Sequence, residues 1–152
     1  MPFARKTQPP PRHLATGDYG EGEALRHLSA RGFSLLARNW RPKGGKRGLE
    51  LDLAGLWESF LVFVEVKTRR TRSPEGMEGP DGLWNFSPAK RRNMARAAQA
   101  YLREHDAWER PCRFDLVCVT LFPGQRPRVD HYRDVIDLGQ TLGNGNASWQ
   151  PW

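Results

Sequence analysis

Apolar and polar positions recur along this chain with two different periods, one typical of helices and one typical of strands. A helical period over residues 18–30 predicts a first helix with Asp18 as its N-cap. Residues 88–108 carry a second helical pattern, and Ser87 before Pro88 is a favourable pair for an N-cap and a first turn. One helix is therefore expected near the start of the chain and another after its midpoint.

Apolar runs and alternating segments predict strands between and after these helices. The segments are residues 33–39, 49–54, 60–68 and 113–121, followed by residues 129–136 as either an edge strand or a short helix. The resulting order is helix, strands, helix, strand. This order predicts a single α/β domain in which helices flank a mixed sheet.

The two ends of the chain lack such patterns. Residues 1–16 are rich in proline and basic residues and predict a disordered basic tail, whereas residues 139–152 are rich in glycine and asparagine and predict a flexible C-terminal tail. The domain proper is expected to be residues 17–138. Within it, residues 69–87 predict a long loop, and loops of this length are usually functional or disordered.

Two charged residues interrupt the most apolar of the predicted strands. Segment 60–68 is apolar on both faces until Glu65 and Lys67, which share one face. Burial on both faces makes such charges costly unless they pair with each other or bind a metal ion. If segment 60–68 forms a hairpin with the preceding strand, Asp52 can lie near Glu65. A Glu65–Lys67 salt bridge and a metal site are both compatible with this pattern.

The residue types at these positions suit one kind of chemistry. Two neighbouring carboxylates repel each other unless they share a proton or a cation lies between them. Oxygen ligands suit a hard cation, Mg²⁺ or Mn²⁺, which keeps water ligands for a substrate. A lysine beside such an ion can orient an attacking water molecule. Asp52, Glu65 and Lys67 thus have the composition of a site for metal-assisted phosphodiester hydrolysis.

Composition narrows the class of protein. The chain has 24 Lys and Arg against 17 Asp and Glu, a net charge of +7, which makes a polyanion a plausible partner. Two cysteines without a CxxC pair exclude a disulfide scaffold and a cysteine zinc site, and they suit a reducing compartment. No apolar run approaches the roughly 18–20 residues that span a bilayer, and no signal peptide is recognisable. We expect a cytoplasmic protein without a membrane partner.

Basic residues are grouped close to the acidic positions in sequence. One group follows the strand 60–68 and comprises Arg69, Arg70 and Arg72; another opens the second helix and comprises Lys90, Arg91 and Arg92. If the two groups converge on the acidic centre, they form a cationic rim that binds nucleic-acid phosphates. The alternative is a set of separate, solvated charge runs.

An ordered set of motifs resembles a known family. Asp52 followed by Glu65-Val66-Lys67 is similar to the PD-(D/E)xK motif of nucleases with the restriction-endonuclease-like fold. Further matches, in chain order, are Gly20-Glu21 with Ala24 and Leu28, Arg38-Asn39, Gly48, Glu50-Leu51-Asp52-Leu53, Phe63 to Arg69, Lys90, and Arg113-Phe114-Asp115. The bare acidic spacing is a weak signal, but the ordered set across residues 17–137 is specific. It resembles the bacterial YraN family, which has no assigned function and is similar in fold to archaeal Holliday-junction resolvases.

The resemblance implies roles for individual residues. Asp52, Glu65 and Lys67 would be catalytic, and Glu21 would join Asp52 and Glu65 as a metal ligand. Glu50 matches a family glutamate that would support the site from outside the ligand set. The residues themselves leave alternatives: Glu21 as an ordinary acid near the start of a helix, and Glu50 as a solvated strand residue.

The resulting functional expectation is a metal-dependent nuclease. Its partner would be nucleic acid, DNA in preference to RNA, and the resemblance to resolvases adds branched DNA as a candidate substrate. The alternatives are a non-catalytic nucleic-acid-binding module that retains the nuclease fold, and a protein-interaction scaffold. Whether the chain forms a homodimer is left open by the sequence.

Overall fold

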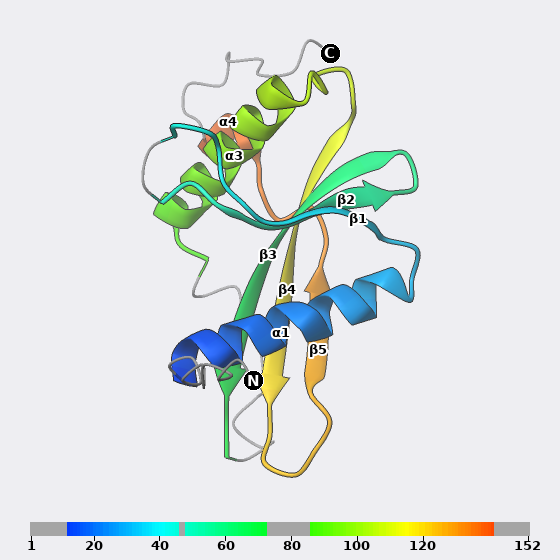
Figure 1. Ribbon diagram of the computed structural model, residues 1–152, viewed down its shortest axis with the longest axis vertical. Coiled ribbons are helices and arrows are strands. Elements are labelled where there is room, and N and C mark those ends of the chain that lie inside the picture. Colours follow the sequence, from blue (N-terminus) through cyan, green and yellow to red (C-terminus); the bar gives the residue numbers. More distant parts are fainter. Residues whose placement is uncertain (1–11, 46–47, 73–85, 142–152) are drawn as a thin grey trace, which may run out of the picture.

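Five strands form one mixed sheet in the order β1-β2-β3-β4-β5, and helices pack on it (Figure 1). The structure is a computed structural model, which describes residues 12–45, 48–72 and 86–141. In chain order its elements are α1 (Arg12–Ser29), β1 (Ser34–Trp40), β2 (Leu51–Trp57), β3 (Phe60–Arg70), α3 (Pro88–Glu104), β4 (Cys112–Leu121), β5 (Arg128–Tyr132) and α4 (Leu138–Thr141). The predicted single α/β domain with a mixed sheet is confirmed.

The connections explain why the sheet is mixed. Neighbouring strands pair antiparallel at β1–β2, β2–β3 and β4–β5, and only β3 and β4 run parallel. A parallel pair requires a crossover between its strands, and the connection from β3 to β4 contains α3. In Figure 1, α1 lies across β3, β4 and β5, with which it is in contact. The two long helices that cover the sheet are therefore α1, which precedes all the strands, and α3, which lies between β3 and β4.

The two faces of β3 are buried in two different hydrophobic clusters. Leu61 and Phe63 belong to the cluster that includes the buried face of α3. Val62 and Val64 belong to the cluster that includes Ala24 and Leu28 of α1. Because successive strand residues point to opposite faces, this alternation places α1 and α3 on opposite sides of the sheet. Burial of β3 on both faces, predicted from its apolar run, is confirmed.

Helix α1 begins at Arg12, six residues before the predicted start at Asp18, so residues 12–16 of the predicted tail are helical. These first turns make a contact that is distant in sequence. The Arg70 guanidinium donates hydrogen bonds from Nε and Nη2 to Thr16 Oγ1, at 3.0 and 2.8 Å, across a separation of 54 residues. This contact attaches the first turns of α1 to the end of β3, which no local pattern reveals.

Helix α3 begins where the sequence predicted. Ser87 is its N-cap, with extended backbone and a side chain that accepts a hydrogen bond from Lys90 N at 3.2 Å, and Pro88 follows in the first turn. The helix ends at Glu104, with His105 as C-cap, which is before the expected end at residue 108. The start of this helix can be predicted because the capping side chain is a near neighbour in sequence. Its end is harder to predict because no glycine follows the last turn.

Other boundaries differ by a few residues. β2 covers residues 51–57 instead of 49–54, β3 continues to Arg70, and the ambiguous segment 129–136 contains an edge strand, β5. Of the predicted tails and loop, residues 1–11, 73–85 and 142–152 lie outside the described residues. None of the described helices is long and apolar enough to cross a membrane.

Candidate functional site

Asp52 and Glu65 meet where two paired strands separate. The ladder between β2 and β3 ends at the pair Leu53–Val64, and the same register places Asp52 opposite Glu65. Before this point β2 pairs with β1 alone. Asp52 Oδ2 accepts a hydrogen bond from the Val66 backbone N–H at 2.8 Å, and its carboxyl group is in hydrogen-bonding contact with that of Glu65. The structure thus brings together the two carboxylates that the sequence proposed as neighbours.

The electrostatics of this pair favour an added positive charge. Burial of Asp52, together with the negative charge of Glu65, raises the pKa of Asp52 to about 8, although the Val66 N–H opposes the shift. At neutral pH Asp52 therefore retains its proton. A bound cation would offset the repulsion from Glu65, which is the second cause of the shift after burial.

Lys67 completes the acidic pair with a positive charge. Its Nζ lies 3.1 Å from Glu65 Oε1, and both side chains are about one-fifth exposed, at 20% and 19%. Burial lowers the pKa of Lys67, but contacts with Lys90 and Glu65 outweigh burial and raise it. Lys67 is therefore an ammonium ion at neutral pH. The salt bridge that the sequence offered as an alternative is present, yet it does not account for Asp52, a second partly buried carboxylate at the same place.

Glu21 lies near this pair without joining it. Its Oε2 accepts a hydrogen bond from Arg38 Nε at 3.4 Å. Burial raises the pKa of Glu21, against the hydrogen bonds from Asn39 and Arg38. Among the described residues, no three His, Cys, Asp or Glu side chains lie close enough together to hold a metal ion. The ligand set of three carboxylates stays a prediction.

Glu50 is held at the rim of the site by a surface ion pair. Its Oε2 accepts hydrogen bonds from Arg41 Nη2 and Nε at 2.8 and 3.1 Å. The Glu50 side chain is 32% exposed. This partial exposure agrees with the alternative in which Glu50 is a solvated strand residue. Glu50 nevertheless also lines a hollow beside the acidic pair.

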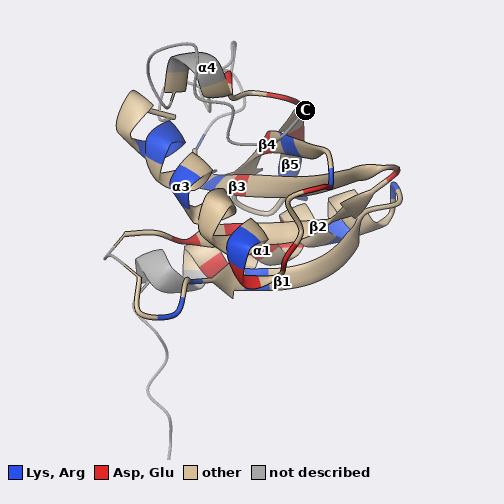
Figure 2. Ribbon diagram, turned by 90° about the horizontal axis from the view of Figure 1, so that it is seen from above, with Lys and Arg blue, Asp and Glu red and all other residues tan. Residues whose placement is uncertain are grey.

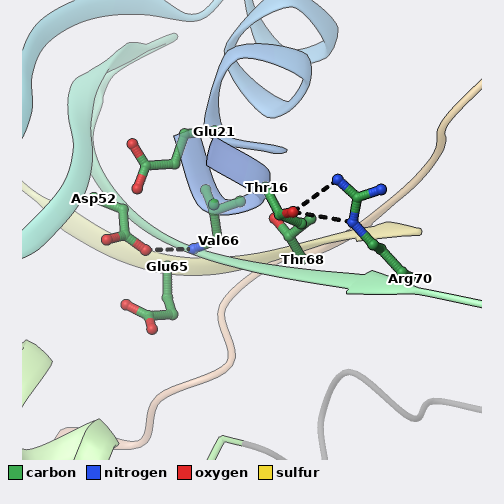
Figure 3. Close-up of a pocket in the computed structure, with 8 residues that line it drawn as sticks. Thr16, Glu21, Asp52, Glu65, Val66, Thr68 and Arg70 are labelled. Carbon is green, nitrogen blue, oxygen red and sulfur yellow. Dashed lines mark hydrogen bonds between the residues drawn. The ribbon is translucent and has the colours of Figure 1, made fainter. Parts of the chain in front are cut away.

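Two hollows adjoin the acidic pair. The first has a volume of about 620 Å³ and reaches toward α1; besides Asp52 and Glu65 it is lined by Thr16, Gly17, Glu21, Val66, Thr68 and Arg70 (Figure 3). The second has a volume of about 290 Å³ and reaches toward α3; besides the same two carboxylates it is lined by Gly48, Glu50, Lys90, Asn93 and Met94. Asp52 and Glu65 line both because β2 and β3 diverge at this point.

The structure separates the predicted basic rim into residues near the site and residues away from it. Arg70 lines the first hollow and Lys90 the second, and Lys90 is in hydrogen-bonding contact with Lys67. Contact with Lys67 and burial lower the pKa of Lys90. Lys90 therefore belongs to the acidic centre more closely than its position at a helix start suggested.

The remaining predicted phosphate contacts have other surroundings. Arg91 donates from Nε to the Phe86 carbonyl at 3.0 Å and lies over the Phe86 ring, and Arg92 lines a separate hollow with Asp137. Arg69 Nε donates to Thr120 Oγ1 at 3.5 Å, and Arg72 lines neither hollow at the acidic pair. These four residues do not line the hollows at the acidic pair, because consecutive side chains point about 100° apart on a helix and alternate on a strand. Their contact with phosphates stays a prediction. Figure 2 shows Lys and Arg spread over α1, α3 and the strands.

Three polar side chains at the hollows carried no prediction. The sequence places Thr16 in a tail, Thr68 in the family motif Phe63 to Arg69 without a role of its own, and Asn93 within the second helix without a role. One signal was available: Thr68 is two residues from Arg70, so the alternation of a strand places both on one face. Thr16 and Asn93 gave no comparable local signal.

Comparison with known proteins gives one consistent result. A model of the uncharacterised protein family UPF0102 matches residues 20–119. A UPF0102 protein of Nitratidesulfovibrio vulgaris (strain DP4) is 47% identical over 141 residues, covering 93% of this chain and 97% of the relative. UPF0102 proteins of Lawsonia intracellularis and Oleidesulfovibrio alaskensis are 38% and 34% identical, covering 90% and 93% of this chain and 96% and 95% of the relatives. The matched region contains β1 to β3, α3 and most of β4.

Proposed function

The chain belongs to the uncharacterised protein family UPF0102, the family that its sequence resembles under the name YraN, and on this premise we propose that it is a metal-dependent nuclease that hydrolyses phosphodiester bonds in DNA. One observation carries the proposal: the paired carboxyl groups of Asp52 and Glu65, with the Lys67 ammonium beside them, line two hollows. Two partly buried carboxyl groups at one place are costly for a fold when both are ionised, so their presence in a hollow supports a chemical role.

The donor set fits Mg²⁺ or Mn²⁺. Mg²⁺ is usually held by one or two protein carboxylates, and water and substrate phosphate complete its coordination. Asp52 and Glu65 supply two carboxylates at one place, so a third protein ligand is not required. The raised pKa of Asp52 reflects its burial and then the negative charge of Glu65, and a bound cation would offset the second cause. When bound, the ion would neutralise phosphate oxygens and lower the pKa of a water molecule.

Lys67 would act as a donor and a fixed positive charge. Because its pKa is raised, its Nζ keeps its proton at neutral pH and is unsuited to act as a general base. Its position 3.1 Å from Glu65 Oε1 holds the ammonium beside the carboxylate pair, although Lys67 itself lines neither hollow. There it can donate a hydrogen bond to a phosphate oxygen on which negative charge develops during hydrolysis.

The reaction balances as a simple hydrolysis. A water molecule forms a new bond to phosphorus, one P–O bond to a sugar oxygen breaks, and the sugar oxygen takes up a proton. The products are a phosphate monoester and a hydroxyl end. Bulk water supplies and accepts the protons, and no redox partner is needed.

A cleavage panel tests the proposal. Labelled duplex, single-stranded, flap and four-way DNA, together with matched RNA, are incubated with the protein and Mg²⁺ or Mn²⁺. We expect divalent-dependent cleavage of DNA by the wild type, and the panel reveals whether branched DNA is preferred. Lys67→Ala and Asp52→Asn should each lower the cleavage rate by about 100-fold or more, as losses of transition-state contacts do, while DNA affinity changes only a few fold.

A matched control lies on the same hairpin. Glu58 is an exposed carboxylate at the turn between β2 and β3, and Glu58→Gln should cleave at the wild-type rate. If the wild type binds DNA but cuts no substrate with either metal, the enzyme proposal is wrong and a binding module with this fold remains. Cleavage that survives Asp52→Asn would mean that the activity comes from elsewhere or from a contaminant.

A further inference from the structure

We propose that another hollow, beside the first, binds one unpaired nucleobase of the DNA strand that reaches the acidic pair. This Tyr19 hollow has a volume of about 310 Å³ and is lined by Tyr19, Arg70, Leu121, Phe122, Gln125 and Pro127. The inference rests on the proposed nuclease function and adds a substrate class to it, DNA with an unpaired nucleotide a few positions from the cleaved bond. It starts from the fact that Arg70 lines both the first hollow and the Tyr19 hollow.

Tyr19 presents a large aromatic ring to solvent. Its exposed fraction is 50%, and the other large hydrophobic residues exposed in the described part of the chain are the aliphatic Leu35 and Leu36. Tyr19 is three residues beyond Thr16, so the two side chains lie on one face of α1. Because Arg70 donates hydrogen bonds to Thr16, this helix face holds the Tyr19 ring beside Arg70.

A tight turn after β4 supplies a second wall. The Gln125 backbone N–H donates to the Phe122 carbonyl at 3.4 Å, and Gly124 has a φ of 68°. Pro123 and Gly124 at the centre of the turn are the pair that a type II turn favours, because its third residue requires a positive φ. Phe122 and Gln125, which flank this pair, both line the Tyr19 hollow. The turn thus fixes an aromatic ring and an amide group before a ligand binds.

The ends of β3 and β4 connect these two walls. Arg70 and Leu121 are partners in the parallel ladder, and the Thr71 backbone N–H donates to the Leu121 carbonyl at 3.0 Å. Leu121 packs against the hydrophobic cluster on the α1 side of the sheet. The hollow is therefore enclosed by α1, the paired strand ends and the turn, which are parts of one packed unit.

The side chains of the hollow suit a nucleobase. Aromatic rings and guanidinium planes are the surfaces on which proteins stack unpaired bases, and Tyr19, Phe122 and Arg70 supply both kinds. The Gln125 amide can donate and accept hydrogen bonds, as the edge of a base does. A volume of about 310 Å³ lies at the small end of the range of about 300–1,000 Å³ for ligand pockets. A base within a duplex cannot enter such a hollow unless it leaves the stack.

Continuity with the first hollow identifies the occupant as part of the bound strand. Figure 3 shows the Arg70 guanidinium at the end of the first hollow that lies away from Asp52 and Glu65. Arg70 is five residues beyond Glu65, or about 16 Å along a strand, which a few nucleotides span at about 3.4 Å each when stacked. None of the described residues that line the Tyr19 hollow is acidic, so a polyanion meets no repulsion there. A strand held at the acidic pair therefore leads to this hollow.

A strand without bases tests whether Tyr19 binds a base or a phosphate. Affinities are measured in EDTA by fluorescence anisotropy, for a labelled single-stranded DNA and for an abasic strand of the same length, which keeps every phosphate. Tyr19→Ala should bind the DNA at least about fivefold more weakly than the wild type, because one base loses its stacking on an aromatic ring. The two proteins should bind the abasic strand equally.

Two variants serve as controls. Tyr19→Phe keeps the ring and should bind both strands as the wild type does. Leu36→Ala removes another exposed hydrophobic side chain, 52% exposed, from β1, which β2 and β3 separate from β4, and it should also bind as the wild type does. Thermal unfolding verifies that each variant is folded.

A single abasic site then locates the bound base. It is moved along the DNA that the wild type cuts with Mg²⁺, so that the cleaved bond defines the position of each nucleotide. We expect one position, a few nucleotides from the cleaved bond, at which loss of the base weakens binding by the wild type. Tyr19→Ala should be insensitive to the abasic site at that position.

The outcomes separate this inference from the function on which it rests. If the wild type cleaves DNA but Tyr19→Ala binds the DNA strand as tightly, or is weakened equally on the abasic strand, the base site is wrong and the nuclease proposal stands. If the wild type cleaves nothing but Tyr19→Ala is weakened on the DNA strand alone, the base site stands and the nuclease proposal fails. A wild type that binds no single-stranded DNA overturns the base site.

Discussion

Asp52 is the residue whose surroundings most clearly oppose its ordinary ionisation. It is partly buried, faces a second carboxylate and receives one backbone hydrogen bond, from Val66. In a protein selected for stability alone, an asparagine would accept the same N–H bond without the charge. The carboxylate therefore destabilises the metal-free fold at neutral pH, and this cost can be measured.

The stability of the metal-free protein should decrease as pH rises. Because the folded-state pKa of Asp52 is about 8, above its ordinary value, the folded protein binds more protons than the unfolded chain at intermediate pH. The free energy of unfolding should thus fall between about pH 4 and pH 8, by at least about 1.4 kcal/mol, the equivalent of one pKa unit. Asp52→Asn should lack this decline. Urea unfolding in EDTA at a series of pH values measures it.

Two additions make this experiment decisive. Glu58→Gln, at the exposed hairpin turn, should show the same decline as the wild type. Mg²⁺ at pH 8 should raise the free energy of unfolding of the wild type, because an ion that binds only the folded state stabilises it, and should leave Asp52→Asn unchanged. Parallel pH curves for the wild type and Asp52→Asn would show that Asp52 is ionised at its ordinary pKa.

At the scale of elements, α1 and β3 approach each other at a glycine. A Cβ atom added at Gly20 would lie 1.8 Å from Thr68 Oγ1, closer than any real contact, whereas one added at Gly22 would have nothing within 4 Å. The two glycines are in the same helix and differ in what they face. The close approach places Glu21 and Thr16 beside the strand that carries Glu65.

Alanine at these two glycines should have opposite effects. Gly22→Ala should stabilise the protein by up to about 1 kcal/mol, because alanine is the better helix former. Gly20→Ala should destabilise it by roughly 1–3 kcal/mol, because α1 must shift away from β3. Thermal or urea unfolding of both variants provides the measurement.

A second substitution tests the cause. Gly20→Ala/Thr68→Ala removes Thr68 Oγ1 and Cγ2, two of the three Thr68 atoms that an alanine at position 20 would meet, so part of the lost stability should return. If Gly20→Ala is as stable as Gly22→Ala, the contact between α1 and β3 is looser than the structure indicates.

At the scale of the whole molecule, the net charge of +7 is distributed instead of concentrated. Basic side chains occur on α1, α3 and the strands (Figure 2), and several pair with carboxylates, as Arg38 does with Asp18 and Arg41 with Glu50. Long-range attraction to a polyanion is therefore moderate, and the local contacts at the two hollows must supply the position of the bound strand.

DNA affinity should fall as the salt concentration rises, and only residues that contact phosphates should change the steepness of this dependence. Each neutralised phosphate of a duplex contributes about −0.9 to the slope of log K against log salt concentration. Arg70→Gln should make the slope less steep by about 1, because Arg70 lines the first hollow. Arg91→Gln should leave it unchanged, since the Arg91 guanidinium is held at Phe86. Anisotropy titrations at several salt concentrations measure both.

The contrast between Arg70 and Arg91 is what makes this test specific. Equal effects of the two substitutions would mean that the basic residues act as a diffuse charge, as the alternative of solvated charge runs holds. An unchanged slope for Arg70→Gln would show that Arg70 does not contact a DNA phosphate.

What the sequence by itself determined is the part of the protein governed by short-range rules. Side chains alternate along a strand, so the apolar run of β3 already predicted two buried faces and placed Glu65 and Lys67 together. Ser87 before Pro88 predicted the start of α3, because an N-cap is a hydrogen bond between near neighbours. The mixed α/β sheet and the acidic pair follow from such patterns and from the ordered family motifs.

The tertiary structure alone decided which of the predicted residues meet. α1 starts at Arg12, and Thr16 in its first turns accepts hydrogen bonds from Arg70 across 54 residues. Lys90 reaches the acidic centre and Arg91 does not, because packing around Phe86 holds Arg91. The divergence of β2 and β3 that exposes Asp52 and Glu65 to two hollows has no sequence signal. These features depend on contacts between distant parts of the chain, which form only when the elements pack, so no local pattern could encode them.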